Sequence, residues 1–313
     1  MSQTAAQAAA NRAAAHETAH ILQSLAVNLA IAVAKLVGAV ISGSGAMLAE
    51  TLHSFADCGN QLLLLLGVRR ARKRPDAAHP LGYGAALYFW SFMVALLLFL
   101  GGGLFSIYEG VHKLLHPEPV GETGLAMAIL LFSVVLESWS LWSNIKDLNA
   151  KRGKIGFFRY LQAAKDSDLI VVFGENAAAV LGLVFAAVFM QLAVTTGNGR
   201  WDAVGSLAIG LVLIGVAVFL AVEVKSLLVG ERAAPEVEAA VHAAAAEDAN
   251  IVKVLRVITI QKGPREVLVA CKLQLADTLT TATVVATINA FEKRLHALCP
   301  EVRWSFVEPD TDD

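Results

Sequence analysis

Six long apolar segments, each about 20 residues or more, limit what this chain can fold into. Hydrophobic residues make up 56% of its 313 positions, which is more than a water-soluble domain of this size normally carries. A helix of about 20 apolar residues crosses the hydrocarbon core of a bilayer while satisfying its own backbone. The predicted spans are 21–41, 46–68, 85–108, 124–145, 169–194 and 201–228. The sequence therefore predicts a polytopic α-helical membrane domain at residues 20–229, after an N-terminal tail at residues 1–19.

Positive charge is concentrated in two of the connections between these spans. Lysine and arginine gather at residues 69–74, after the second span, and at residues 151–165, after the fourth. The other connections carry almost none. By the positive-inside rule, both basic loops and both chain ends are expected in the cytoplasm. The first twenty residues lack a basic region followed by an apolar core, so no cleaved signal peptide is expected. The cell (inner) membrane is the expected location.

The composition changes abruptly at Gly230, and the remaining residues, 230–313, have mixed charge and short periodic segments. A helix is expected after Pro235, and Val284, Phe291 and Leu295 mark a second, amphipathic helix. Alternating apolar positions predict three strands, at residues 255–261, 267–275 and 302–307. The order αββαβ predicts a small α+β ferredoxin-like domain on the cytoplasmic side. It contains no catalytic pattern, so a regulatory or dimerising role is expected.

Three ionisable residues, Glu50, His53 and Asp57, interrupt the second apolar span. Each costs roughly 2.5–3.5 kcal/mol at hydrocarbon depth on insertion scales, so such residues usually serve the passage of ions or protons. At about 3.6 residues per turn, the three share one helix face. An imidazole nitrogen and a carboxylate oxygen aimed at one point suit zinc and its neighbours in the first transition row.

Several motifs occur together in one order. They are LAETLHSFADCGNQ in the second span, RPDAAHPLGYG in the following loop, YEG at Tyr108, and the small sheet domain. In this combination the chain resembles the cation diffusion facilitator family of divalent-metal transporters, in the branch with an HPxGYG loop. The resemblance implies a homodimer and a four-ligand metal site between the second and fifth spans, with two ligands from each. His53 and Asp57 match the pair from the second span.

The fifth span departs from the family pattern, because Asn176 stands where an aspartate is expected and Val172 where a histidine is expected. Asp168 lies about 12 Å from Asn176 along the helix axis and is expected near the cytoplasmic mouth. Glu175 is at the right depth. The hypothesis is therefore a site of His53, Asp57, Glu175 and Asn176, in which two carboxylates balance a dication.

Other polar residues are given supporting roles. Glu50 is expected to accept a hydrogen bond from the second nitrogen of metal-bound His53. Lys35, in the first span, is expected to pair with such a carboxylate or to snorkel to the inner surface. Asp76 and His79 match two residues of a peripheral family metal site, although Tyr83 replaces a further histidine of some relatives. Alternatively, the HPLGYG turn is purely structural, with Gly82 and Gly84 supplying backbone conformations that other residues avoid.

The expected function is export of a divalent metal ion, zinc first, in exchange for protons, with no organic cofactor and no nucleic-acid partner. Manganese, iron, cobalt or nickel is the alternative substrate, because carboxylate and amide ligands favour harder ions. A non-transporting metal-binding scaffold or sensor is an alternative from another class. An intramembrane metalloprotease would need a motif such as HExxH, which the sequence lacks, so no enzymatic activity is expected.

Overall fold

The structure is a computed structural model that describes residues 25–26, 28–116, 123–163, 167–264 and 266–312. The chain divides into two compact units. A helical unit takes in residues up to 66 together with 90–157 and 168–222. The second unit groups residues 223–313 with two segments that the sequence analysis treats as loops, 67–89 and 158–167.

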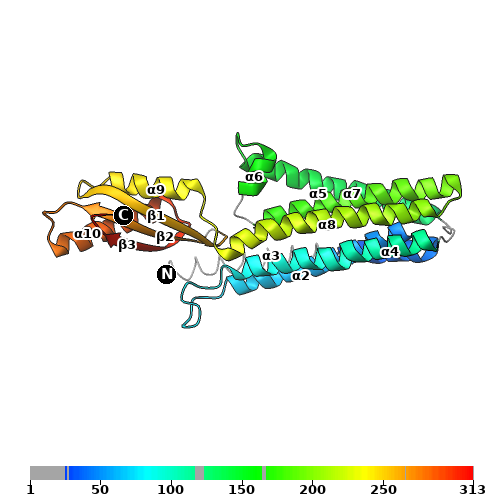
Figure 1. The fold of residues 1–313 in the computed structure, drawn as a ribbon, viewed down its shortest axis with the longest axis horizontal. Helices are drawn as coiled ribbons and strands as arrows, with labels where there is room; N and C mark the ends of the chain where they lie inside the picture. The colour runs from blue at the N-terminus through cyan, green and yellow to red at the C-terminus, as the bar shows by residue number, and fades with distance from the viewer. Residues whose placement is uncertain (1–24, 27, 117–122, 164–166, 265, 313) are drawn as a thin grey trace, which may run out of the picture. The chain divides into compact units, whose positions relative to one another are not determined.

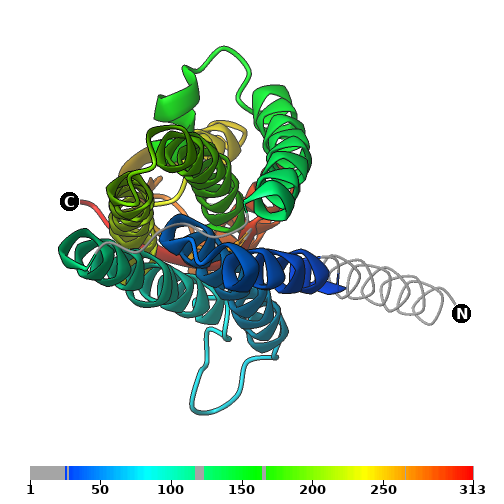
Figure 2. The same cartoon turned by 90° about the vertical axis from the view of Figure 1, so that its right-hand side faces the viewer.

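Long helices make up the helical unit, and Figure 2 shows them side by side and close to end-on. The first described helix is Asn28–Ser42. The helices that follow it are α2 (Gly45–Ala71), α3 (Ala86–Leu97), the π-helical segment η1 (Leu98–Leu104), α4 (Phe105–Leu115), α5 (Gly124–Lys151), α7 (Ser167–Thr196) and α8 (Arg200–Val229), and Figure 1 labels all of them except η1. The short helix α6 (Phe157–Ala163) falls mostly in the second unit. No break separates α3, η1 and α4, so they form one continuous span.

Four helices in the described ranges are long and apolar enough to cross a membrane, where the sequence predicts six. They are Ala86–Leu115, Gly124–Ala150, Ile170–Thr196 and Arg200–Val229. These four correspond to the third to sixth predicted spans. The two others differ for separate reasons. Only a shorter apolar helix, Asn28–Ser42, is described in the first, and α2 carries polar residues along its length that lower its hydropathy.

Close backbone approach joins the α3–η1–α4 span to α8. A Cβ added to Gly103 would lie 2.6 Å from a side-chain carbon of Ile214, and one added to Gly110 would lie 2.9 Å from the backbone nitrogen of Leu207. Gly210 of α8 meets Ile107 of α4 in the same way, at 2.9 Å. Small residues allow helices in a membrane to pack through backbone contact. This packing fixes the ends of α4 and α8 relative to each other.

The second unit contains a three-stranded mixed sheet in the order β1-β2-β3, antiparallel between β1 and β2 and parallel between β2 and β3. Its elements are α9 (Pro235–Ala246), β1 (Ile251–Gly263), β2 (Glu266–Leu275), α10 (Thr281–Leu298) and β3 (Val302–Pro309). They follow the helix-strand-strand-helix-strand order that the sequence predicts. Alternate residues of β2, from Val267 to Leu273, are buried against Val241 of α9 and Phe291 of α10.

The HPLGYG loop belongs to this second unit, and its two glycines have different roles. Gly82 has φ +77°, a left-handed conformation that favours glycine, as the sequence predicts. Gly84 does not have a positive φ, so the conformational explanation was wrong for it. It lies instead against the end of β1, where a Cβ on Gly84 would be 2.9 Å from the carbonyl oxygen of Lys262. Gly84 is required by this close approach, because any larger residue would separate the two segments.

Candidate metal site

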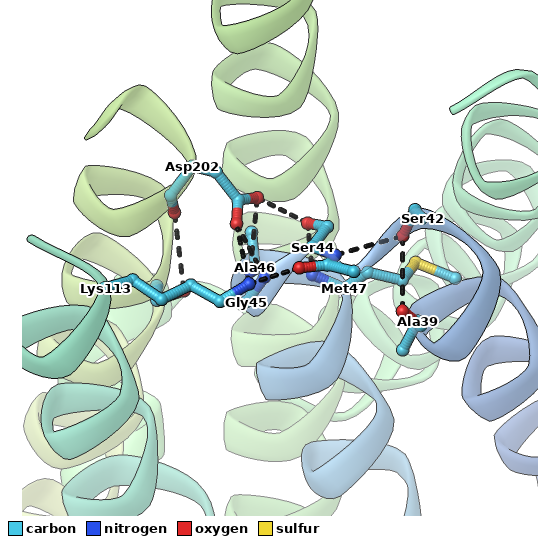
Figure 3. Close-up of polar contacts among 10 residues, drawn as sticks. Ala39, Ser42, Ser44, Gly45, Ala46, Met47, Lys113 and Asp202 are labelled. Carbon is cyan, nitrogen blue, oxygen red and sulfur yellow. Dashed lines mark hydrogen bonds and ion pairs between the residues drawn. The ribbon is translucent and has the colours of Figure 1, made fainter. Parts of the chain in front are cut away.

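The N-terminus of α2, the helix that carries His53 and Asp57, is held by a buried carboxylate from α8 (Figure 3). Asp202 is 1% exposed and accepts hydrogen bonds from the Ser44 hydroxyl, from the backbone N–H of Gly45 at 2.6 Å and from that of Ala46 at 3.4 Å. The first N–H groups of a helix have no partner within the helix and carry partial positive charge. Asp202 satisfies them from a neighbouring helix.

A third helix joins this contact through Lys113, near the end of α4. Its ammonium lies 3.5 Å from Oδ2 of Asp202, toward which the side chain extends in Figure 3, and also donates to the carbonyl of Gly43, in the turn before α2. Helices α2, α4 and α8 are therefore connected at one end by a single ion pair. Sequence reasoning missed this pair. The available signal was two opposite charges at span ends, one closing the third span and one opening the sixth.

His53 and Asp57 lie one turn apart on α2, as predicted. The Nδ1 atom of His53 is 3.6 Å from Oδ1 of Asp57, which is too long for a hydrogen bond, and His53 is 0% exposed. Neither ring nitrogen of His53 nor Oδ1 of Asp57 has a hydrogen-bond partner among the described residues. Buried polar atoms are almost always paired. Two adjacent unpaired ligand atoms are therefore suited to accept a cation.

Glu175 of α7 faces α2, as the hypothesis for the site requires, but it is bonded to a residue that sequence reasoning missed. Its Oε1 accepts a hydrogen bond of 2.6 Å from the side-chain amide of Asn60, which is fully buried. Asn60 lies about one turn beyond Asp57, and this spacing on the ligand face was the signal in the sequence. In the described part of the chain, no three or more His, Cys, Asp or Glu side chains approach closely enough to hold a metal ion.

Two contacts define how α2 and α7 face each other. Asn60 bonds Glu175, and Oε1 of Glu50 lies so close to Gly182 that a Cβ there would collide with it. As residue numbers fall along α2 they rise along α7, so the helices are antiparallel. Residues three, four and seven positions after Glu175 share its face, so buried Ala178 and Ala179 lie between these contacts, at the level of His53 and Asp57. At that level α7 therefore presents only small methyl groups.

Asn176, the other predicted ligand of the fifth span, is half-buried and follows Glu175 directly. It is rotated by about 100° from Glu175 on an ideal helix. The structure thus brings His53 and Asp57 together and places Glu175 against α2, without joining all four predicted ligands. Asp168 lies within α7, but its side chain is outside what the structure describes.

The sequence predicts that Glu50 accepts a hydrogen bond from His53, and this prediction was wrong. Glu50 pairs instead with Lys35 of the first helix. The Nζ atom of Lys35 lies 3.3 Å from Oε2 of Glu50 and donates to Oγ of Ser54 at 2.8 Å. Lys35 and Glu50 are both 0% exposed. A buried ammonium requires an anion more strongly than a neutral imidazole requires an acceptor, which explains the choice of partner. The predicted pairing of Lys35 with a carboxylate of the second apolar segment is confirmed.

The predicted peripheral site at Asp76 and His79 has a different arrangement. One oxygen of Asp76 accepts from the Lys73 ammonium at 2.7 Å and the Tyr83 hydroxyl at 2.8 Å, and the other accepts the backbone N–H groups of Ala78 and His79. These hydrogen bonds, that of Lys73 first, lower the pKa of Asp76 well below its usual range. The carboxylate thus closes the turn, with a lysine ammonium where a dication would have to bind.

Comparison with known proteins gives the context for this geometry. A family model described as the cation efflux transmembrane domain matches residues 21–229. The proton-coupled zinc antiporter SLC30A9, mitochondrial, of Xenopus laevis is 38% identical over 204 residues, which cover 64% of this chain and 36% of the relative. The human protein of the same name is 35% identical over 204 residues, with the same shares of 64% and 36%. This chain therefore spans little more than a third of these relatives.

Shorter relatives extend the comparison to plants and bacteria. Metal tolerance protein C4 of Arabidopsis thaliana is 34% identical over 191 residues, 60% of this chain and 42% of the relative. The zinc transporter ZitB of Pectobacterium atrosepticum is 30% identical over 153 residues, 48% of this chain and 45% of the relative. The aligned relatives named here are proteins of metal transport or tolerance.

Proposed function

Because the chain belongs to the cation efflux family, the cation diffusion facilitators that its motifs indicate, we propose that it exports zinc from the cytoplasm in exchange for protons. One observation carries the proposal: His53 and Asp57 present unpaired, buried ligand atoms one turn apart on α2. Zinc accepts a mixture of imidazole nitrogen and carboxylate oxygen. The names of the relatives from frog, human and Pectobacterium, which include a proton-coupled zinc antiporter and a zinc transporter, support zinc as the ion.

Glu175 and Asn176 complete the proposed site. In the described conformation Glu175 is bonded to Asn60, and binding of the ion would exchange that hydrogen bond for coordination. Glu175 and Asp57 would then balance the two charges of zinc, while His53 and the amide oxygen of Asn176 contribute as neutral ligands. A ligand must lose its proton before it can bind a metal, so entry of zinc releases protons and entry of protons releases zinc. If this one site is exposed alternately to the two sides of the membrane, zinc is exchanged for protons.

The orientation and assembly follow from the same proposal. We infer that the chain crosses the inner (cell) membrane six times. Both ends of the chain then lie in the cytoplasm, and the basic residues 69–74 lie on the cytoplasmic side, as the positive-inside rule requires. The Asp202 and Lys113 contact then lies at the opposite end of the bundle. Residues 230–313 form the cytoplasmic domain, and a homodimer would use this domain. Cysteine labelling of loop residues in intact vesicles tests the orientation.

Transport by purified protein in liposomes tests the function. With a proton gradient imposed across the liposome membrane, we expect uptake of zinc that a protonophore abolishes. The His53→Ala variant is expected to show no uptake. His242→Ala, which removes an exposed histidine of α9, is the matched control and is expected to transport normally. Unchanged zinc uptake in His53→Ala would overturn the assignment.

A harder ion is the second candidate, because Glu175, which the bond to Asn60 holds against α2, and Asn176 would add oxygen ligands beside a single histidine. Manganese and iron prefer such ligands more than zinc does. Competition of manganese, iron, cobalt and nickel with zinc in the same liposomes distinguishes these substrates. Metal binding without flux in the wild-type protein would instead indicate a scaffold or sensor.

A further inference from the structure

The ion pair of Lys35 and Glu50 has no part in the exchange described above, although it lies beside the proposed ligands. Glu50 precedes His53 by three residues, so it faces the same side of α2 as His53 and Asp57. Its Oε2 is 3.3 Å from the Lys35 ammonium, which also donates to Ser54 at 2.8 Å. Lys35 comes from the first helix, so the charge that neutralises Glu50 is supplied from outside α2.

The second oxygen of Glu50 is in a different environment. Oε1 is buried and has no hydrogen-bond partner among the residues that the structure describes. It lies against Gly182 of α7, on the face that Gly182 shares with Glu175. One oxygen of Glu50 is therefore held by Lys35, while the other is unpaired and directed between the two helices that carry the proposed ligands.

A carboxylate in this position has the chemistry of a fifth ligand. Carboxylate oxygens favour manganese and magnesium relative to zinc, whereas a single imidazole among few ligands favours zinc. If Glu50 joined the site, the added anionic ligand would strengthen binding of a dication and favour ions of higher coordination number. In the described structure Lys35 opposes this, because it neutralises Glu50 and holds its Oε2.

We propose that Lys35 is a positioning residue that holds Glu50 away from the transported ion, and so keeps the site selective for zinc and able to release it. This inference rests on the proposed function, because it assumes that His53 and Asp57 bind the ion. It adds a role for the first helix, which contributes no ligand.

The test is a double-mutant comparison on the whole chain, residues 1–313, in detergent. Lys35→Met removes the charge and keeps the length of the side chain, Glu50→Gln removes the anion, and the double variant replaces both. Binding of zinc and of manganese is measured by equilibrium dialysis. In Lys35→Met we expect manganese to bind roughly tenfold more tightly relative to zinc, the order of effect of one added charged ligand. In the double variant the ratio is expected to return close to the wild-type value.

Two further variants separate positioning from folding. Lys35→Arg retains the cation and is expected to keep the wild-type ratio. Lys35→Gln retains a donor for Ser54 without the charge, and it replaces Lys35→Met if that variant does not fold, as judged by size-exclusion chromatography. A general loss of structure would weaken the binding of both zinc and manganese, and a second substitution at Glu50 would not restore it.

Two results would overturn the inference. One is a wild-type ratio of manganese to zinc binding in the folded charge-removed variant. The other is an equal increase in that variant and in the double variant, because Lys35 would then act on the ion by repulsion and not through Glu50. The proposed function fails separately, when wild type and His53→Ala bind zinc equally. If the wild type binds zinc through His53 and the folded charge-removed variant of Lys35 keeps the wild-type ratio, only the inference is contradicted.

Discussion

The carboxylate of Asp202, in the first turn of α8, accepts the backbone N–H of Gly45 at 2.6 Å, at the start of α2. The contact crosses 157 positions of sequence and is buried. A carboxylate at a helix N-terminus normally comes from the helix itself or from the residue before it. Here it comes from another helix, so the start of α2, about 12 Å along the axis from His53, is set by α8.

We expect Asp202→Ala to destabilise the helical unit. The substitution leaves the first N–H groups of α2 without their acceptor and the ammonium of Lys113 without its anionic partner, and removal of one member of a buried ion pair costs about 3–5 kcal/mol. Asp202→Asn retains an oxygen acceptor and should lose less. Thermal unfolding in detergent measures both, with the exposed Asp147→Ala on α5 as the control. Equal melting temperatures for Asp202→Ala and Asp147→Ala would show that α2 does not depend on this contact.

We expect Asn60→Ala to bind zinc more tightly than wild type while unfolding more easily without it. Asn60 competes with the ion for Glu175, to which it donates at 2.6 Å, and its loss leaves a buried carboxylate unsatisfied at a cost of about 1–3 kcal/mol. Zinc affinity and melting temperature are measured on the same samples, with exposed Gln191→Ala of α7 as the control. Weaker zinc binding in Asn60→Ala would mean that Asn60 is itself a ligand.

The sequence predicts the features that depend on local periodicity. The pairing of His53 with Asp57 is a spacing of four on one helix, and the strands of the second unit follow from alternating residues such as Val267 and Val269. Contacts between helices depend on the register between segments that are distant in the chain. No local pattern gives that register, so the bonds of Asn60 to Glu175 and of Lys113 to Asp202 were missed.

The expected role of Glu50 shows the same limit. From the second span alone, His53 is an ionisable residue one turn from Glu50, and a hydrogen bond between them is the simplest interpretation. The first helix brings a buried ammonium to the same place, and its charge determines the partner. The role of Glu50 therefore depends on which residues of other helices come close to it.

We expect Gly263→Ala to destabilise the contact between the HPLGYG loop and the end of β1. A Cβ at Gly263 would lie 2.7 Å from the Cα of Gly84, and neither backbone can yield as a flexible side chain would. Overpacking of this kind typically costs about 1–3 kcal/mol. Gly156→Ala, where nothing lies within 4 Å of the added Cβ, is the matched control. Limited proteolysis of the loop should be faster in Gly263→Ala only, and equal rates in both variants would exclude a structural role for the contact.

The loop around Asp76 gives a prediction for pH. The hydrogen bonds from Lys73 and Tyr83 lower the pKa of Asp76 in the folded loop below the value of about 3.9 for an unfolded chain. A lowered carboxylate pKa contributes stability that is complete above the unfolded value and is lost as pH falls through the folded one. The turn should therefore remain ordered from neutral pH to about pH 4, and open only in stronger acid.

Carboxyl chemical shifts of Asp76 in NMR titrations measure this directly. In Lys73→Met we expect the midpoint to move upward, because the largest cause of the shift is removed. A midpoint at the ordinary value in wild type would mean that Asp76 does not close the turn, and would leave its oxygens free for the peripheral metal site.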